Sequence, residues 1–362
     1  MEELKQILLT HYSCYPKMGM EDAVKLIYQN EFGCGHFVTD ESTSLVRLTE
    51  EVSKITAKLP KESLFEEIGN GFSRLNLGAL VEGFPLTTVN RFFVNTSRLN
   101  LGTKEGFEAK LQLLGELCAQ GLLPFDQVDL GSYLQEYEAQ GYPPVSHSRV
   151  YRGEYNPSYR VVSSQYAHYF PLFWEIEKLL KSQDHVVVAI DGPSGSGKST
   201  LSKLLQGVYH CPVIKMDHFF LRPEQRTPQR FQEPGGNVDY ERFQGEVGAG
   251  LKRGLPFSYQ IYNCQTNRLT KSPPIEAHPL RVVEGSYSLH PTLRDNYDLR
   301  VFLTISPEEQ RERILKRNGP QMLERFLGEW IPLEEQYFSS CQIQEHSDLV
   351  FREYKHFPIG NS

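Results

Sequence analysis

The feature of this 362-residue chain that most constrains its fold is a glycine-rich segment near the middle. Residues 192–200 read Gly-Pro-Ser-Gly-Ser-Gly-Lys-Ser-Thr and match the pattern G-x-x-x-x-G-K-[S/T] in full. The preceding stretch, 185–191, is apolar and typical of a buried parallel strand, and the leucines that follow are spaced for a helix face. Strand, glycine-rich turn and helix form the setting in which this pattern cradles phosphate. We therefore predict a parallel α/β domain that binds a nucleoside triphosphate.

Residues 192–200, called the phosphate loop below, have distinct expected roles. The glycines let the backbone curl so that successive N–H groups point toward phosphate oxygens. Lys198 places a positive charge near the β- and γ-phosphates, and Ser199 offers a hydroxyl to Mg²⁺. A flexible Gly/Ser turn is the alternative, and the strand–turn–helix setting argues against it. The residues predicted to bind phosphate are Gly192, Ser194, Gly195, Ser196, Gly197, Lys198, Ser199 and Thr200.

Length and composition indicate a globular protein of about two domains. Hydrophobic residues make up 39% of the chain and charged residues 23%, and the net charge of −7 argues against a general nucleic-acid binder. No apolar run is long enough to cross a membrane, and the N-terminus has no secretory signal pattern. The six cysteines include no C-x-x-C pair, which favours free thiols in the cytoplasm. We expect neither nucleic acid nor a membrane as a partner, and the oligomeric state stays open.

The two halves of the chain differ in pattern. Residues 1–164 are predicted to form a mostly helical domain of unknown function, because apolar residues recur at three-to-four spacing. Within them, 87–95 fits either a strand or a helical turn, and 145–166 looks like a connecting segment. Residues 165–362 alternate strands and helices, as in a P-loop NTPase sheet flanked by helices. We expect strands at 185–191, 212–217, 257–262, 280–284 and 298–304, and helices at 198–206, 239–252, 307–317 and 319–339.

Acidic residues end two of the predicted strands. Asp217 ends 212–217 and Glu284 ends 280–284, so both are expected at the sheet edge that carries the phosphate loop. Asp217 can accept the proton of a substrate hydroxyl or help to hold Mg²⁺, and Glu284 can orient a metal-bound water. The alternative is that each carboxylate only caps or closes its strand.

Three more charged residues are candidates for the same site. Arg313 and Arg317 lie four positions apart in a predicted helix and share one of its faces. Such a face can fold over a triphosphate and neutralise its charge, whereas a solvated charge run is the ordinary alternative. Asp239 is the first residue of the predicted helix 239–252. Its spacing fits a helix cap and a substrate contact equally well.

Taken in order, these segments resemble the uridine kinase–phosphoribulokinase family of phosphate-loop kinases over about residues 183–340. The resemblance implies that Asp217 is the base for the acceptor hydroxyl, that Asp239 holds sugar hydroxyls and that Tyr262 lies against the acceptor ring. It also implies that Arg313 and Arg317 belong to a lid that closes on the phosphates. The matching segments are 192–200, Asp217-His-Phe-Phe220, Asn237-Val-Asp239, Tyr262-Asn-Cys264, Glu284-Gly285 and the helix with both arginines.

Two departures from that family affect the expected acceptor. Asn263 and Cys264 stand where uridine kinases have Asp and Phe, and the histidine that usually follows is not evident. A base-reading site depends on particular polar partners, so the acceptor stays open among a nucleoside, a sugar and another small alcohol or vitamin. The predicted activity is ATP-dependent phosphorylation of a hydroxyl on a small metabolite, with a uridine kinase-like nucleoside acceptor as the first candidate. The catalytic candidates are Lys198, Asp217, Arg313 and Arg317, and the metal ligands are Ser199 and Glu284.

A regulatory switch that binds ATP and hydrolyses it slowly is the alternative from another class, because a fold does not fix a function. A GTPase is disfavoured, since Thr270-Lys271-Ser272-Pro273 lacks the Asp of a guanine-reading motif.

Two residue sets in the first half also invite functional hypotheses. An aromatic and guanidinium cluster is more typical of a domain interface than of an anion or base site. It comprises Tyr151, Arg152, Tyr155, Tyr159 and Arg160. A second set has metal-ligand chemistry but lacks zinc-finger spacing, so ordinary core and loop residues are expected. It comprises His11, Cys14, Cys34 and His36.

Overall fold

The computed structural model describes residues 1–34, 38, 40–55, 63–80, 83–99 and 102–354. Its internal contacts separate two compact units, Met1–Phe170 and Pro171–Tyr354. The expected domain boundary at residue 164 falls inside the first unit, between β3 (Tyr159–Ser163) and α8 (Ser164–His168).

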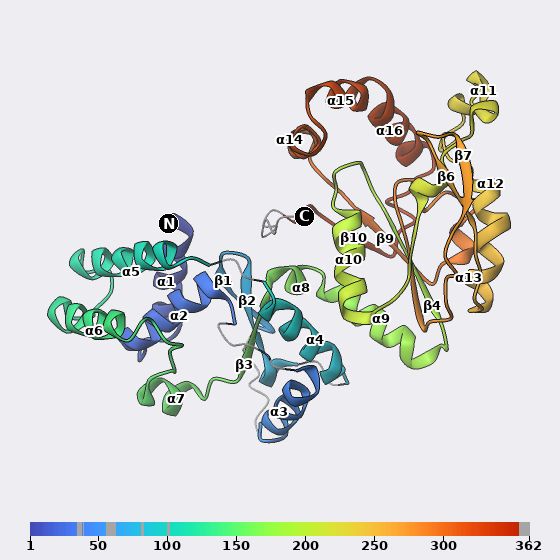
Figure 1. Ribbon diagram of the computed structural model, residues 1–362. Coiled ribbons are helices and arrows are strands. Elements are labelled where there is room, and N and C mark those ends of the chain that lie inside the picture. The colour runs from blue at the N-terminus through green and yellow to red at the C-terminus, as the bar shows by residue number, and fades with distance from the viewer. Residues whose placement is uncertain (35–37, 39, 56–62, 81–82, 100–101, 355–362) are drawn as a thin grey trace. The chain divides into compact units, whose positions relative to one another are not determined.

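The first unit is mostly helical and contains one antiparallel sheet in the order β1–β2–β3 (Figure 1). Its strands before β3 are β1 (Phe65–Gly69) and β2 (Phe72–Asn76). Its helices before α8 are α1 (Glu2–Cys14), α2 (Met20–Phe32), α3 (Glu41–Ser53), α4 (Leu86–Ser97), α5 (Lys104–Ala119), α6 (Gln127–Ala139) and α7 (Arg149–Tyr155). The core forms where α2 packs on α1, α5 and β1, and the predicted apolar helix faces meet there with side chains such as Val24, Ile27, Phe107 and Leu114 fully buried.

Two local expectations for this unit are corrected or resolved by the structure. Residues 87–95 lie in α4, where Val89 and Phe92 occupy one buried helix face. The expected connecting segment 145–166 instead contains α7, β3 and the start of α8. β3 pairs along its whole length with β2 and packs against α4, whose Thr96 hydroxyl accepts a hydrogen bond from the Ser163 N–H at 2.8 Å. This pairing depends on distant partners that no local pattern indicates.

The second unit contains a five-stranded parallel sheet in the order β10–β9–β4–β8–β5, which confirms the predicted α/β fold. The central strand β4 (Val186–Asp191) is buried at all six residues, as both of its faces are covered. The other strands are β5 (Val213–Lys215), β8 (Leu280–Glu284), β9 (Leu299–Leu303) and β10 (Leu349–Phe351).

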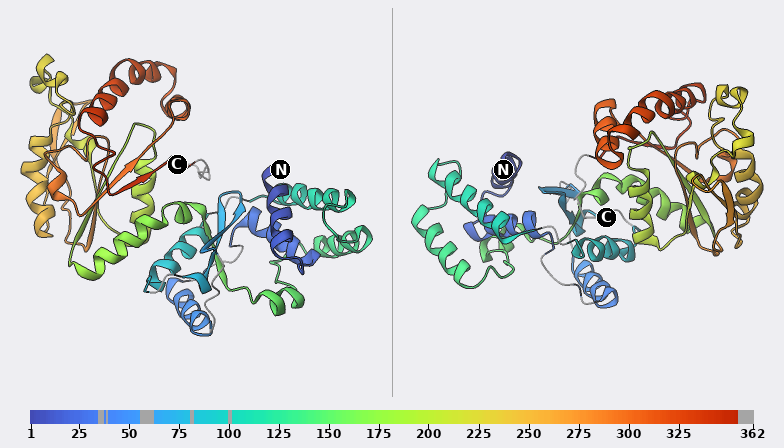
Figure 2. Two further views of the ribbon diagram at one scale, coloured as in Figure 1. Left: turned by 180° about the vertical axis from the view of Figure 1, so that it is seen from behind. Right: turned by 45° about the horizontal axis from the view of Figure 1, so that its top comes forward.

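Helices cover both faces of this sheet (Figures 1 and 2). Val187 and Ala189 of β4 pack against the segment that contains α12 and α13, and α10 packs on β4 and β8. The helices are α9 (Phe170–Ser182), α10 (Lys198–Tyr209), α11 (Pro228–Gln232), α12 (Tyr240–Phe243), α13 (Ala249–Arg253), α14 (Pro307–Asn318), α15 (Pro320–Arg325) and α16 (Ile331–Ser340). α14, α15 and α16 form an arc at the end of the sheet where β4 leads into α10 (Figure 1).

The sheet differs from expectation at two strands. The predicted strand 257–262 is not part of the parallel sheet. Only its last three residues lie in a strand, β6 (Gln260–Asn263), which forms an antiparallel hairpin with β7 (Arg268–Lys271). All four residues of β7 are exposed, so this hairpin does not form a buried layer. The fifth parallel strand is β10, which is only three residues long and partly exposed, and therefore shows no strand pattern in the sequence.

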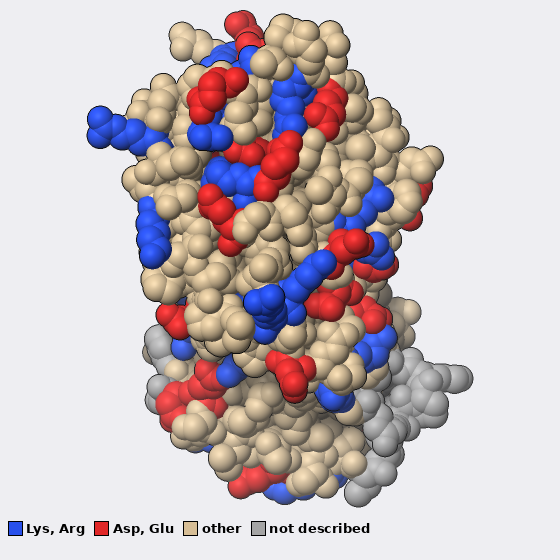
Figure 3. Space-filling model, turned by 90° about the vertical axis from the view of Figure 1, so that its right-hand side faces the viewer, with Lys and Arg blue, Asp and Glu red and all other residues tan. Residues whose placement is uncertain are grey.

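Three further features of the described residues concern surface charge, helix length and the cysteines. On the face that Figure 3 shows, Lys and Arg side chains are interspersed with Asp and Glu. Among the described residues, no helix combines the length and apolar character needed to span a bilayer. All six cysteines are free thiols.

Candidate functional site

The phosphate loop forms the turn between the end of β4 at Asp191 and the start of α10 at Lys198. Gly192, Gly195 and Gly197 have φ values of +146°, +83° and +102°, which side chains on an L-residue rarely allow. A Cβ atom on Gly192 would also lie 2.3 Å from the carbonyl oxygen of Leu303. The glycines are therefore required by the backbone path and not by flexibility alone.

The loop has donors that the protein itself does not use. Within the described residues, the N–H groups of Gly195 and Gly197 have no hydrogen-bond partner. The Ser196 side chain is 1% exposed, and its hydroxyl is likewise unpaired among those residues. Buried polar groups are normally paired, so these donors suit an anion held in the turn.

Lys198 and Thr200 occupy the first turn of α10. The Lys198 ammonium group donates to the carbonyl oxygens of Gly192 (2.7 Å) and Pro193 (2.9 Å), and the side chain is buried. These bonds hold the ammonium group against the loop. A bound phosphate can replace the two carbonyl oxygens as its partner. Thr200 is exposed on the same turn.

Asp191 stabilises the start of the phosphate loop through hydrogen bonds. Its buried carboxylate accepts hydrogen bonds from the N–H groups of Gly192, Tyr287 and Leu289 and from the Tyr337 hydroxyl. Burial raises the pKa of Asp191 to about 6, although these four bonds and the Lys198 charge favour the ionised form. The residue fixes the strand end before the turn and was not predicted from the sequence.

Ser199 and Glu284, the two residues predicted to hold a metal, lie close to one another. The Ser199 hydroxyl is 3.2 and 3.4 Å from the two carboxylate oxygens of Glu284. Burial raises the pKa of Glu284, and the nearby negative charge of Asp217 raises it further. A carboxylate and a hydroxyl in contact at the end of the loop fit Mg²⁺, which prefers oxygen ligands and keeps several waters.

Asp217 lies past the end of β5 and not in the strand. It is exposed in the 3₁₀ turn Met216–Phe219, near the Glu284 carboxylate whose pKa it raises. The neighbouring His218 ring accepts or donates a hydrogen bond with the Tyr259 hydroxyl at 2.8 Å. An exposed carboxylate beside the metal candidates is free to meet an acceptor hydroxyl.

Asp239 and Tyr262 are both engaged within the protein. Asp239 is buried at the N-cap of α12, where it accepts from the Arg242 N–H and forms an ion pair with the Arg242 guanidinium at 3.3 Å. Arg242 also donates to the carbonyl oxygen of His218 at 2.8 Å, which links Asp239 to the Asp217 turn. The Tyr262 hydroxyl donates to Asn267 at 2.8 Å across the β6–β7 hairpin.

The two predicted lid arginines of α14 have different surroundings. Arg313 donates to the carbonyl oxygen of Gly195 at 3.2 Å and forms an ion pair with Glu309 at 2.6 Å. Arg317 is exposed, and its guanidinium donates to Asn318 at 2.7 Å. Of the two, the structure brings only Arg313 into contact with the phosphate loop.

The structure adds residues to the loop that sequence reasoning missed. Gln310 of α14 donates to the Ser194 carbonyl at 2.9 Å, and Glu334 of α16 accepts from the Ser194 N–H at 2.9 Å. The Ser286 hydroxyl lies within hydrogen-bond distance of the Gly192 carbonyl, at 3.1 Å. No motif marks these positions, because each contact joins segments far apart in the chain.

Several described members of the two candidate sets of the first unit make contacts within that unit, whereas Cys14 and Arg152 are exposed. The Tyr151 ring stacks on His147 with centroids 4.2 Å apart, and the Tyr159 hydroxyl lies 2.7 Å from the same histidine. Arg160 forms an ion pair with Glu51 at 2.7 Å. His36 lies outside the described residues, and among those described no cluster of three or more metal-ligating side chains occurs.

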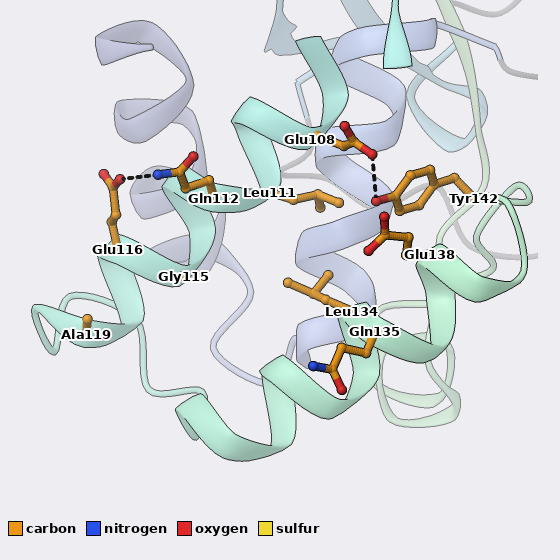
Figure 4. Close-up of a pocket in the computed structure, with 10 residues that line it drawn as sticks. All are labelled: Glu108, Leu111, Gln112, Gly115, Glu116, Ala119, Leu134, Gln135, Glu138 and Tyr142. Carbon is orange, nitrogen blue, oxygen red and sulfur yellow. Dashed lines mark hydrogen bonds between the residues drawn. The ribbon is translucent and has the colours of Figure 1, made fainter. Parts of the chain in front are cut away.

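A pocket of about 490 Å³ lies between α5 and α6 in the first unit (Figure 4). Figure 4 shows Leu111 and Leu134 at its centre and the Tyr142 hydroxyl donating to Glu108 at its rim, at 3.1 Å. It includes none of the predicted site residues, so the candidate chemistry is that of the phosphate loop.

Comparison with solved structures finds similarity to proteins described as kinases or possible kinases. A possible uridine kinase from Bacillus stearothermophilus is 21% identical over 50% of this chain and 99% of its own, with a TM-score of 0.38. A proposed fructose transport system kinase from Silicibacter sp. TM1040 is 20% identical over 49% of this chain and 97% of its own, with a TM-score of 0.41. A proposed P-loop kinase with a circular permutation from Saccharomyces cerevisiae is 14% identical over 51% and 99%, with a TM-score of 0.40. No family model matches the sequence, and no curated protein matches it.

Proposed function

We propose that the second unit is an ATP-dependent phosphotransferase that phosphorylates a hydroxyl group of a small metabolite. The observation that carries this proposal is the phosphate loop itself. Its glycine conformations, its unpaired N–H donors and the Lys198 ammonium group make one preformed anion cradle at the end of a parallel strand.

The residues around the cradle supply what phosphoryl transfer requires. Transfer needs alignment and neutralisation of charge more than covalent help from the protein. Ser199 and Glu284 would hold Mg²⁺, which neutralises charge on the phosphates when it is bound. Lys198 would leave the loop carbonyls and contact the phosphates. Arg313 would add positive charge from α14, and Arg317 would do so only after a rearrangement of that helix.

Asp217 is the proposed base for the acceptor. Its carboxylate is exposed beside Glu284, so an acceptor hydroxyl can approach it and give up its proton as the phosphate is transferred. Asp239 and Tyr262 would contact the acceptor, in addition to the capping and hairpin bonds that they make here. We propose a nucleoside as the first acceptor to test, followed by sugars and other small alcohols.

An acceptor screen tests this function. The full chain is incubated with MgATP and a panel of nucleosides, sugars and small alcohols, and ADP is measured with and without each compound. ADP formation that depends on an acceptor is expected, and Lys198→Ala should abolish it. Slow ADP formation that no acceptor accelerates would contradict the proposal and favour a regulatory switch.

A further inference from the structure

Helix α16 places a carboxylate on the rim of the phosphate loop. Glu334 is 4% exposed and accepts hydrogen bonds from the Ser194 N–H at 2.9 Å and from the Ser194 hydroxyl at 2.7 Å. The Ser286 hydroxyl donates a third bond to the same carboxylate at 2.8 Å. One anionic side chain therefore uses three donors at the start of the loop.

The same stretch of α16 is attached to the strand that leads into the loop. The Tyr337 hydroxyl, one helical turn beyond Glu334, donates to Asp191 at 2.9 Å. Ser286, which donates to Glu334, is also within hydrogen-bond distance of the Gly192 carbonyl at 3.1 Å. A movement of α16 that withdraws Glu334 would therefore also affect the contacts of Asp191 and Gly192, where β4 ends and the loop begins.

The contacts from α14 and α16 use different backbone groups of the phosphate loop. Gln310 and Arg313 of α14 bind carbonyl oxygens, those of Ser194 and Gly195, and so leave the N–H groups available to an anion. Glu334 instead binds an N–H group, which is the kind of donor that phosphate oxygens use.

A bound nucleotide would meet Glu334 at its terminal phosphate. Ser194 directly follows Gly192 and Pro193, whose carbonyls hold Lys198, the residue expected at the β- and γ-phosphates. A carboxylate and a phosphate cannot share one N–H donor, and two anions held side by side away from water repel each other. A nucleotide with only one phosphate does not extend that far along the loop.

We propose that Glu334 is an internal competitor of the terminal phosphate, so that α16 must release Ser194 before a triphosphate fully occupies the loop. The inference rests on the proposed function and adds a control on nucleotide affinity to that same site. We call this contact between Glu334 of α16 and Ser194 the latch. It would distinguish a triphosphate from a monophosphate by charge.

Nucleotide binding by charge-neutral variants tests the latch. Glu334→Gln keeps the size of the side chain and one carbonyl oxygen for Ser194 but removes the charge. The matched control is Glu335→Gln, which changes the exposed neighbour on the same helix. Calorimetric titration of the full chain is carried out with a non-hydrolysable MgATP analogue and with AMP. We expect Glu334→Gln to lower the Kd for the analogue about fivefold or more, with the Kd for AMP unchanged and Glu335→Gln like wild type.

The other outcomes overturn the inference. An unchanged or weaker affinity of Glu334→Gln for the analogue would mean that the carboxylate only orders the loop. An equal gain for AMP, or the same gain in Glu335→Gln, would mean that the effect is not competition at the terminal phosphate. Failure of the wild-type chain to bind the analogue at all would contradict the proposed function itself and the latch with it.

A second measurement needs no change at Glu334. The chain has two tryptophans, and Trp174→Phe leaves only Trp330, which directly precedes α16. Its fluorescence is expected to change on addition of the MgATP analogue and to stay constant with AMP. A constant signal with both nucleotides would show that α16 does not move and would overturn the latch.

Discussion

At the scale of single residues, a substitution at Asp217 should lower turnover without weakening nucleotide binding. It lies outside the phosphate loop and is exposed, so its loss should leave the anion cradle intact. We expect Asp217→Asn to lower turnover by about 10²–10⁴ with little change in the Kd for MgATP, because a general base acts on the acceptor. Steady-state kinetics and calorimetry measure the two quantities. Asp184→Asn, an exposed carboxylate before β4, is the control, and undiminished turnover in Asp217→Asn would remove the assignment.

Gly192 tests the backbone path of the loop. An alanine there must adopt a φ of +146° and place its Cβ 2.3 Å from the Leu303 carbonyl, so the turn has to shift. Gly192→Ala is therefore expected to abolish calorimetric binding of MgATP. Gly245→Ala is the matched control, because a Cβ at that helical position meets nothing within 4 Å. Normal binding by Gly192→Ala would show that the turn is not the cradle.

At the scale of elements, the sheet of the first unit is held to α2 by a buried charge. Arg74 of β2 is 3% exposed, forms an ion pair with Glu66 of β1 at 3.2 Å and donates to Gln29 of α2 at 2.8 Å. Its guanidinium also lies over the Tyr159 ring of β3, 4.6 Å from the centroid. These contacts join all three strands to the helix.

Removing that charge should destabilise the first unit. Arg74→Met removes the buried guanidinium from Glu66 and Gln29, which costs about 3 kcal/mol of unfolding free energy. Glu66 keeps its contact with His11, and Gln29 keeps its contact with Tyr159. Amide hydrogen exchange of β1, β2 and β3 measures the loss. Arg91→Met, which removes a half-exposed ion pair with Glu41, should cost about 0–1 kcal/mol. Equal effects of the two variants would contradict a special role for Arg74.

The elements also show what the sequence can and cannot predict. The phosphate loop, its strand and its helix follow from local pattern, since glycine positions and apolar spacing carry their own physical requirements. β3 and β10 do not, because their formation depends on strands elsewhere in the chain. Glu334 and Ser194 are in contact although they lie 140 positions apart in the chain, and no pattern in either segment predicts this contact. The sequence predicts Asp217 at the end of a strand, whereas the structure has it in the 3₁₀ turn that follows β5.

At the scale of the whole molecule, a buried histidine predicts a response to acid. Burial, and then the nearby Arg74 charge, lowers the pKa of His11 to about 4 from 6.5. The unfolded chain therefore binds a proton between about pH 6.5 and 4 that the folded chain does not. The resulting stability is complete above pH 6.5 and is lost as the pH falls through that window.

This response can be measured in the full chain. Between pH 7 and pH 5, the first unit should lose about 1–2 kcal/mol of stability through His11, read from hydrogen exchange in α1 and β1. His11→Gln should reduce that loss, and His346→Gln, an exposed histidine of the second unit, should not. The same pH dependence in wild type and His11→Gln would show that other groups dominate.

Nucleotide binding by the phosphate loop is tested most directly by a calorimetric titration of the purified chain with MgATP, run beside Lys198→Ala. The phosphate loop predicts saturable binding of one nucleotide per chain by the wild type, strongly weakened in the variant because the cradle loses its only ammonium group. Absence of binding heat in the wild type, at concentrations where the protein is folded, would contradict the claim that this loop holds a nucleoside triphosphate.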